Sequence, residues 1–350
     1  MNFREYIGQH KHEIYSKICD YLPLHDPIDH YKIVRTYSNR QSSYRRPGLL
    51  ILVGQMLGAS IDDLLLPAAA MQLSEDWILI HDDIEDHSTI RRGKESLNKL
   101  YGMEVALNAG DAAHIVMWKM LKDYMINNKQ GPLVYDKFYD MAKKTAEGQF
   151  LDINFIYNKK NFEGINEELY FEIIIRKTCY YSIYGPMQLG AIIANADQEI
   201  IQILEYIGKP AGIAFQILDD LQDIIGNEES FGKQKYEDLY EGKITLIMLY
   251  ASYQNATQEE KSKINSIYAK VRENKTKDDI NFLLNIIFRY SSLDYVKKIC
   301  EKYIIEANKN IEIYSTKLND NEYSQILKTA VDELYETIKN LNNYGSNFNL

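Results

Sequence analysis

The clearest pattern along the chain is a helical spacing of apolar residues near its C-terminal end. Apolar side chains recur there at intervals of three and four over several turns, which is the period of one buried helix face. The stripe predicts a long amphipathic helix packed in a core. Its residues are Val296, Ile299, Cys300, Tyr303, Ile304, Ala307, Ile311, Tyr314 and Leu318.

Short polar segments such as 127–131 and 254–261 separate the apolar ones, and their length is typical of connections between helices. No alternating strand pattern of useful length is present. The chain has only seven prolines and none after Pro210, which favours long helices. We therefore expect an all-α fold, with a single domain over 1–350 and a frayed tail from about Asn342.

Two acidic clusters, 82–86 and 219–223, share the pattern DDxxD, and each follows an apolar run. On a helix the first and last aspartates of each cluster are four apart and share a face. Like charges at that spacing cost roughly 0.2 to 0.5 kcal/mol per pair, so a compensating cation is expected. Oxygen-only ligands suit magnesium, which substrate phosphates commonly complete. One such cluster is usually a solvated helix face, but two matched clusters predict a magnesium–diphosphate site across the central cavity of a helical bundle.

Composition narrows the class of protein. The 350 residues are 45% hydrophobic, enough for a large core, and the net charge of −10 argues against nucleic acid as a partner. The N-terminus has no signal-peptide core, and polar residues interrupt the apolar stretch 49–66, so we expect a cytoplasmic protein without a transmembrane segment. Cys19, Cys179 and Cys300 are scattered and are expected to be reduced and mostly buried.

The basic run 91–94, Arg-Arg-Gly-Lys, begins five residues after Asp86. Guanidinium groups bind diphosphate oxygens in pairs. Alone, such a run is usually a surface loop. Directly after a carboxylate cluster it predicts the cationic half of a diphosphate clamp.

These motifs and their satellites resemble the trans-isoprenyl diphosphate synthases, the polyprenyl synthetase family, in order and spacing over roughly residues 40 to 250. The resemblance implies an all-α bundle around a deep cavity, usually homodimeric. Such enzymes condense an allylic diphosphate with isopentenyl diphosphate head to tail, with magnesium. The matching motifs are 82–86, 91–93, Gly148-Gln149 with Asp152, Lys177-Thr178, 215–223 and Gly242-Lys243.

The resemblance also implies the metal ligands. Asp82 and Asp86 would hold two magnesium ions against the allylic diphosphate, and Asp219 would hold a third from the opposite wall. Their neighbours would act on these ions through the ligands or through water; they are Asp83, Asp220 and Asp223.

The cationic and polar contacts to the substrate follow in the same way. Arg91, Lys177 and Lys233 match family residues that contact the leaving diphosphate. Thr178 and Gln216 match polar groups near the developing allylic cation. Metal and cations together would stabilise the charge that develops as the carbon–oxygen bond breaks.

The implied reaction is stepwise. Ionisation forms an allylic cation, the double bond of isopentenyl diphosphate attacks it, and a proton leaves to the departing diphosphate. No side-chain base is required, so we interpret His81 as a helix-packing residue and His87 as a loop residue.

The acceptor side departs from the family pattern. Family members carry a lysine three residues before Arg46, where this chain has Ser43, and a histidine or glutamine seven residues before Asp82, where it has Glu75. A carboxylate facing a diphosphate is repulsive. The ending 345–350 also lacks the basic residues that often close this site.

Three explanations of these departures remain open. Arg45 or Arg40 replaces the lysine; the site works with Arg46 and Arg92 alone; or the acceptor is not isopentenyl diphosphate.

Product length in the family depends on side chains just before the first acidic cluster, which form the floor of the tunnel for the growing chain. Trp77 and Ile78 stand at these positions. A large floor residue is similar to short-chain synthases, so geranylgeranyl or farnesyl diphosphate is the expected product. The alternative is that Trp77 only packs the helix core.

Three hypotheses follow. The first is a magnesium-dependent short-chain prenyltransferase. The second is an ionising enzyme of the same fold with another acceptor, or a terpene-synthase-like cyclase. The third is a non-catalytic partner subunit, which predicts eroded acidic clusters, whereas both are complete.

Overall fold

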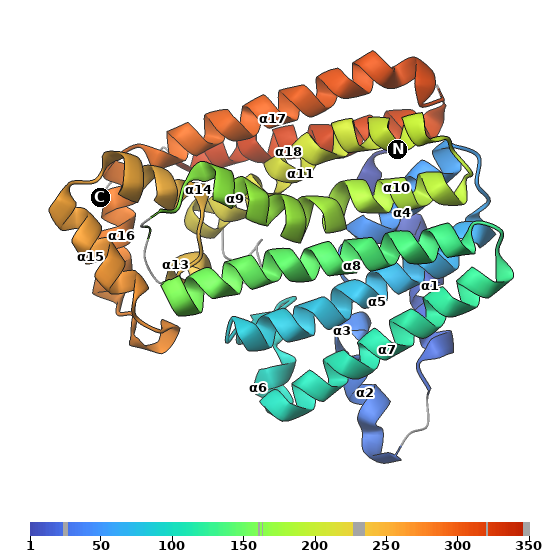
Figure 1. Ribbon diagram of the computed structural model, residues 1–350, viewed down its shortest axis with the longest axis horizontal. Helices are drawn as coiled ribbons and strands as arrows, with labels where there is room; N and C mark the ends of the chain where they lie inside the picture. Colours follow the sequence, from blue (N-terminus) through green and yellow to red (C-terminus); the bar gives the residue numbers. More distant parts are fainter. Residues whose placement is uncertain (24–26, 160–161, 163, 227–234, 320, 346–350) are drawn as a thin grey trace. The chain divides into compact units, whose positions relative to one another are not determined.

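The structure is a computed structural model that describes residues 1–23, 27–159, 162, 164–226, 235–319 and 321–345. The described residues are mostly helical, as expected for the all-α class, and their strands are the two-residue pair β1 and β2 (Figure 1).

Contacts along the chain divide it into two compact units. Unit 1 comprises Met1–Ala142, Tyr181–Gly208 and Asn308–Val331, and unit 2 comprises Lys143–Tyr180, Lys209–Ala307 and Asp332–Leu350. The single domain over 1–350 stays a prediction.

The elements that lie wholly in unit 1 include its two long helices, α5 and α7 (Figure 1). They are α1 (Phe3–Tyr21), η1 (Pro27–Asp29), α2 (His30–Val34), α3 (Thr36–Asn39), α4 (Arg45–Met56), α5 (Ile61–Glu85), β1 (Ile90–Arg91), β2 (Lys94–Glu95), α6 (Leu97–Tyr101), α7 (Met103–Asn127), α10 (Gly185–Ile193) and η6 (Ser315–Lys317).

Unit 2 has shorter helices of its own. They are η2 (Phe155–Lys159), α9 (Glu167–Ile174), α13 (Glu237–Glu241), α14 (Leu246–Met248), η4 (Leu249–Asn255), α15 (Gln258–Tyr268), η5 (Arg272–Asn274) and α16 (Lys277–Arg289). Elements with residues in both units are α8 (Gly131–Asn154), η3 (Ile175–Tyr184), α11 (Gln198–Ile225), α17 (Ser292–Tyr314) and α18 (Glu322–Gly345).

Helix α5 is the centre of unit 1, where it packs against α7, α4 and α1 (Figure 1). Ser60 caps its N-terminus by accepting the backbone N–H of Asp63, and the acidic first turn suits the positive end of the helix dipole. From Leu64 to Asp76 nearly every side chain is buried. A helix that is apolar on all sides needs such surroundings on all sides.

Helix α4 approaches α10 very closely. A Cβ on Gly190 would lie 2.3 Å from the carbonyl oxygen of Leu50. Only glycine permits this separation, and it brings α10 and the preceding residues Tyr181 and Ser182 to the start of α4.

The C-terminal stripe is mostly buried: Val296, Cys300, Ile304 and Ala307 of α17 are fully enclosed. Ile299, Tyr303 and Tyr314 are partly exposed. Helix α18 continues to Gly345, past the residue at which the tail was expected to begin. The three cysteines are free thiols, with Cys179 and Cys300 buried and Cys19 partly exposed.

Candidate active site

The first acidic cluster occupies the last turn of α5, where the helix dipole is negative. Asp82 is 20% exposed, whereas Asp83 and the C-cap residue Asp86 are buried. Carboxylates at this end of a helix lose about 0.3 to 1 kcal/mol each against the dipole. The arrangement therefore favours a bound cation more strongly than the i,i+4 spacing alone.

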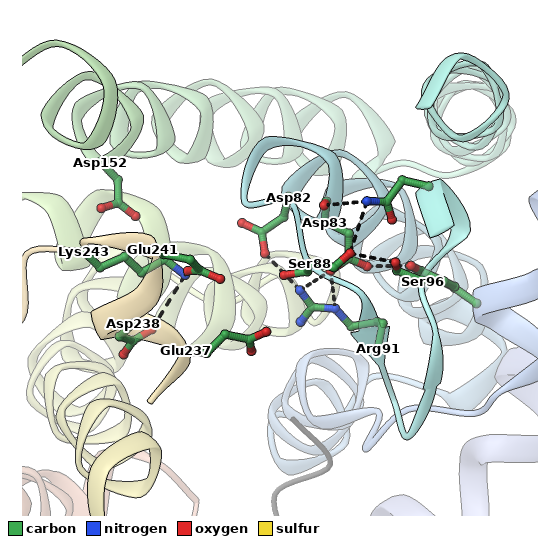
Figure 2. A network of polar contacts seen from close by, with 12 residues as sticks. Asp82, Asp83, Ser88, Arg91, Ser96, Asp152, Glu237, Asp238, Glu241 and Lys243 are labelled. Atoms are coloured by element: carbon green, nitrogen blue, oxygen red, sulfur yellow. Dashed lines mark hydrogen bonds and ion pairs between the residues drawn. The ribbon is translucent and has the colours of Figure 1, made fainter. Parts of the chain in front are cut away.

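Asp83 does not point to solvent but fixes Arg91. Its carboxylate accepts Nε of Arg91 at 2.8 Å and Nη2 at 2.5 Å (Figure 2). It also accepts the hydroxyl of Tyr37 at 2.5 Å. The same Nη2 lies 3.3 Å from Asp82. Burial disfavours the charged guanidinium, but the two carboxylates outweigh it and raise the pKa of Arg91 above its ordinary value. Arg91 is thus a permanent cation held beside Asp82.

A small hairpin places the two arginines. Strands β1 and β2 pair antiparallel, and the two residues that join them, Arg92 and Gly93, have φ of 53° and 72°. Left-handed angles at both positions define the tight turn that best joins two twisted strands, and glycine favours the second. The sequence signal for this turn was the Arg-Gly pair itself. Arg40 holds the hairpin by donating to the carbonyls of Arg91 at 3.0 Å and Glu95 at 2.7 Å.

Glu75 lies between the two arginines expected at the acceptor diphosphate. Its Oε2 is 3.1 Å from Nη1 of Arg46 and its Oε1 is 3.3 Å from Nη2 of Arg92. Burial disfavours the ionised carboxylate, but the two guanidinium groups outweigh it and lower the pKa of Glu75. The carboxylate expected to repel a diphosphate is therefore neutralised inside an ion-pair network.

A lysine that the sequence reasoning missed reaches the loop where the family lysine is absent. Lys11 of α1 donates to the carbonyl of Ser42 at 3.1 Å, and its ammonium lies 5.6 Å from the ring centre of Tyr44. Ser43, between them, is exposed. Nothing in the local sequence relates position 11 to position 43, because only the packing of α1 joins them. Arg40 is already engaged with the hairpin, which weakens it as the substitute.

The second acidic cluster occupies the last turns of α11 in unit 2, and its neighbours form a hydrogen-bond chain. Thr178 donates to Gln216 at 2.8 Å, and the Gln216 amide donates to Asp220 at 2.9 Å. Tyr170 donates to the second oxygen of Asp220 at 2.9 Å.

Burial, with Asp238 and Asp219 nearby, raises the pKa of Asp220 well above its ordinary value. The structure thus brings Thr178 and Gln216 together, and Asp219 is partly exposed.

Lys177 pairs with Asp152 at 2.6 Å, from η3 and the end of α8. A Cβ on Gly148 would lie 2.5 Å from the backbone nitrogen of Lys177, so only glycine allows α8 to pass this close to η3. Gly148, Asp152 and Lys177, which all belong to the motifs shared with the family, therefore lie close together. The π-helical η3 is a form often found at functional sites.

Asp223 has a structural task. Its carboxylate accepts the backbone N–H groups of Glu237 at 2.9 Å and Asp238 at 3.3 Å, which begin α13. The capping residue Tyr236 provides no side-chain bond, so Asp223 satisfies two otherwise unpaired donors. Lys243, just beyond α13, pairs with Glu241 at 2.6 Å and Asp238 at 3.8 Å (Figure 2).

The chemistry of the first cluster fits a hard divalent cation. Asp82 and Asp86 offer only oxygen donors, at a helix end where positive charge is favoured. Within the described part of the chain, no group of three or more His, Cys, Asp or Glu side chains forms a ready-made metal cage. Magnesium in proteins is usually held by one or two carboxylates and completed by water and substrate oxygens.

The remaining predicted residues lie as follows. Trp77 and Ile78 are half-buried on α5, two turns or less before Asp82. His81 packs against Trp77 and lies 3.5 Å from Asp111, as expected of a packing residue. The exposed His87 follows the end of the helix, as expected of a loop residue.

The predicted diphosphate contact Lys233 lies outside the described residues. No described helix is long and apolar enough to cross a membrane.

The sequence profile of the polyprenyl synthetase family matches residues 30–287. The chain belongs to this family of isoprenyl diphosphate synthases and is a prenyltransferase.

Individual isoprenyl diphosphate synthases are similar to this chain over most of its length. The chain is 31% identical over 303 residues to a geranylgeranyl diphosphate synthase of Methanosarcina mazei, covering 85% of this chain and 88% of the relative. It is 29% identical to a geranylfarnesyl diphosphate synthase of Aeropyrum pernix, covering 84% and 90%. Among solved structures, a geranylgeranyl pyrophosphate synthetase from Pyrococcus horikoshii superposes with a TM-score of 0.83 at 27% identity, over 95% of this chain and 98% of that one.

Proposed function

We propose that this chain is a short-chain trans-prenyltransferase that condenses an allylic diphosphate with isopentenyl diphosphate, using magnesium, and releases geranylgeranyl or farnesyl diphosphate. The observation that carries the proposal is the carboxylate cluster at the end of α5 with the cation of Arg91 held against it. Family membership and the relative named as a geranylgeranyl diphosphate synthase support it. Neither favours a changed acceptor or a cyclase.

In the proposed reaction, bound magnesium supplies Lewis-acid stabilisation of the leaving diphosphate. Asp82 and Asp86 would hold two ions; the resemblance assigns a third to Asp219. Arg91 and Lys177 would then stabilise negative charge as the carbon–oxygen bond breaks.

On the acceptor side, Arg46 and Arg92 would bind isopentenyl diphosphate, and Lys11 is a candidate for the missing lysine charge. Thr178 and Gln216 would present oxygen atoms to the allylic cation. The proton lost at the end would leave with the diphosphate, so no side-chain base is needed.

The test is to incubate the purified protein with magnesium, isopentenyl diphosphate and each allylic primer separately, and to identify products by mass. We expect elongation to a short-chain diphosphate, and its loss when a chelator removes the metal. Diphosphate release from the primer without elongation would instead support the ionising alternative.

Asp82→Ala should lower turnover by roughly 100-fold or more, because it removes a metal ligand at the leaving group. Asp62→Ala, an exposed change in the first turn of the same helix, is the matched control and should leave turnover unchanged. Full function in Asp82→Ala would revive the hypothesis of a non-catalytic partner subunit.

A further inference from the structure

The position of Glu75 is unusual because one buried carboxylate contacts two guanidinium groups with different oxygens. Oε2 contacts Arg46 at 3.1 Å and Oε1 contacts Arg92 at 3.3 Å. The side chain is only 8% exposed, against 23% for Arg46 and 13% for Arg92. The carboxylate is thus less accessible to solvent than either arginine.

Each arginine also has anchors of its own. Arg46 donates from Nε to the hydroxyl of Ser182 at 3.1 Å, and its guanidinium lies 4.9 Å from the ring centre of Tyr181. Tyr181 is in turn 2.8 Å from the hydroxyl of Ser74, next to Glu75 on α5. These contacts fix the plane of the guanidinium but leave one edge of it for Glu75.

Arg92 is held by the next residue along α5. Its Nη2 lies 2.9 Å from Asp76 and its Nη1 donates to the carbonyl of Tyr37 at 2.6 Å. Asp76 is fully buried and accepts Ser38 at 2.5 Å and Gln72 at 3.3 Å. Glu75 is therefore the link between a fixed Arg92 and the otherwise separate Arg46.

We infer that Glu75 is a positioning residue for the acceptor diphosphate: it sets the spacing of Arg46 and Arg92 and holds them as a preformed pair. The inference rests on the proposed function and refines its acceptor side. A directly binding neutral side chain is replaced by a carboxylate that acts through two arginines. Preorganised charged donors bind an anion with less loss of side-chain freedom than free ones.

A positioning role and a repelling role of Glu75 predict opposite effects on acceptor binding when its charge is removed. Glutamine at position 75 has one acceptor and one donor, so its NH₂ would face an N–H of one arginine and break that contact. A positioning role therefore predicts weaker acceptor binding in Glu75→Gln. Simple repulsion predicts tighter binding, because a negative charge is removed.

The experiment measures binding of isopentenyl diphosphate by calorimetry without an allylic primer, so that no reaction occurs, and then the KM for each substrate. We expect Glu75→Gln to raise the Kd and the KM for isopentenyl diphosphate about tenfold, the loss expected for one charge-assisted contact. The KM for the allylic diphosphate should stay unchanged. Glu104→Gln, an exposed carboxylate on α7, is the matched control for charge and should change neither.

Two further variants separate positioning from a general loss of folding. Glu75→Asp keeps the charge but is one methylene shorter and cannot span both arginines, so it should also raise the KM for isopentenyl diphosphate. In an Arg46→Met background, Glu75→Gln should have a smaller effect than in the wild type, because the pair is already broken. Melting temperatures show whether each variant is folded.

Tighter or unchanged binding of isopentenyl diphosphate by folded Glu75→Gln and Glu75→Asp would overturn the inference and leave the proposed function intact. A wild-type protein that neither binds nor elongates with isopentenyl diphosphate would overturn the proposed function itself.

Discussion

The contacts of Trp77 bear on its two predicted roles, packing of the helix core and the floor of the product tunnel. Its ring packs against His114 on α7 at 4.4 Å between centres and against His81 on its own helix at 5.6 Å. His114 accepts the indole N–H of Trp118 at 2.7 Å. Burial, with His81 nearby, lowers the pKa of His114, which suits a neutral acceptor. These contacts make Trp77 a packing residue, and its role at the tunnel floor stays a prediction.

Trp77→Ala separates the two roles. If the indole limits product length, removing it should shift products to longer chains, identified by mass with a single primer. Trp118→Ala removes another ring of the same cluster and should leave product length unchanged. An unchanged product from Trp77→Ala, with a lowered free energy of unfolding, would leave only the packing role.

At the scale of elements, the short helix α13 is bracketed by charged residues. Asp223 binds its first N–H groups, and Lys275 donates to the carbonyls of Leu239 at 3.1 Å and Tyr240 at 2.7 Å at its other end. Arg272 bridges Glu237 and Glu241 within it. A five-residue helix is marginal alone, so these contacts determine its position and that of the following Lys243.

Because Lys275 is buried, the stability of the region around α13 depends on pH. Burial lowers the pKa of Lys275 from 10.5 to about 8. Between those values the unfolded chain binds a proton that the folded chain does not, so raising the pH favours the folded state. We expect the free energy of unfolding of the wild type, relative to Lys275→Met, to rise from pH 8 to 10.5 by at most about 3 kcal/mol.

Denaturant unfolding across this pH range measures the effect. Lys277→Met changes an exposed lysine two residues away and should show no such slope relative to the wild type. A flat difference between the wild type and Lys275→Met would mean that Lys275 is an ordinary lysine.

At the scale of the whole molecule, the net charge of −10 means that an anionic substrate depends on local cations and metal.

Helix α7 carries several exposed apolar side chains. Met103 and Leu107 are 54% and 47% exposed and are four residues apart, so they share a helix face, and Ile115, 69% exposed, lies about two turns farther along the helix. Such a face suits a second copy of the chain, as the resemblance predicts.

Leu107→Asp combined with Ile115→Asp should convert the predicted homodimer to a monomer, because charges at the centre of an apolar interface are costly. Light scattering after gel filtration gives the mass directly. Ile305→Asp, at an apolar residue of α17 that is 61% exposed, should leave the mass unchanged. A wild-type protein that elutes as a monomer would contradict the prediction at once.

The sequence by itself determined the helical class, the family and the acidic clusters, because these depend on local spacing. Carboxylates at intervals of four, apolar stripes and motif order are properties of neighbouring residues. Tertiary structure alone decided what each charge does. Asp83 fixes Arg91, Asp223 caps α13, and Glu75 joins Arg46 to Arg92. The partners of Asp223 and Glu75 lie more than ten residues away along the chain, so only packing could show that an apparent repulsion is an ion pair.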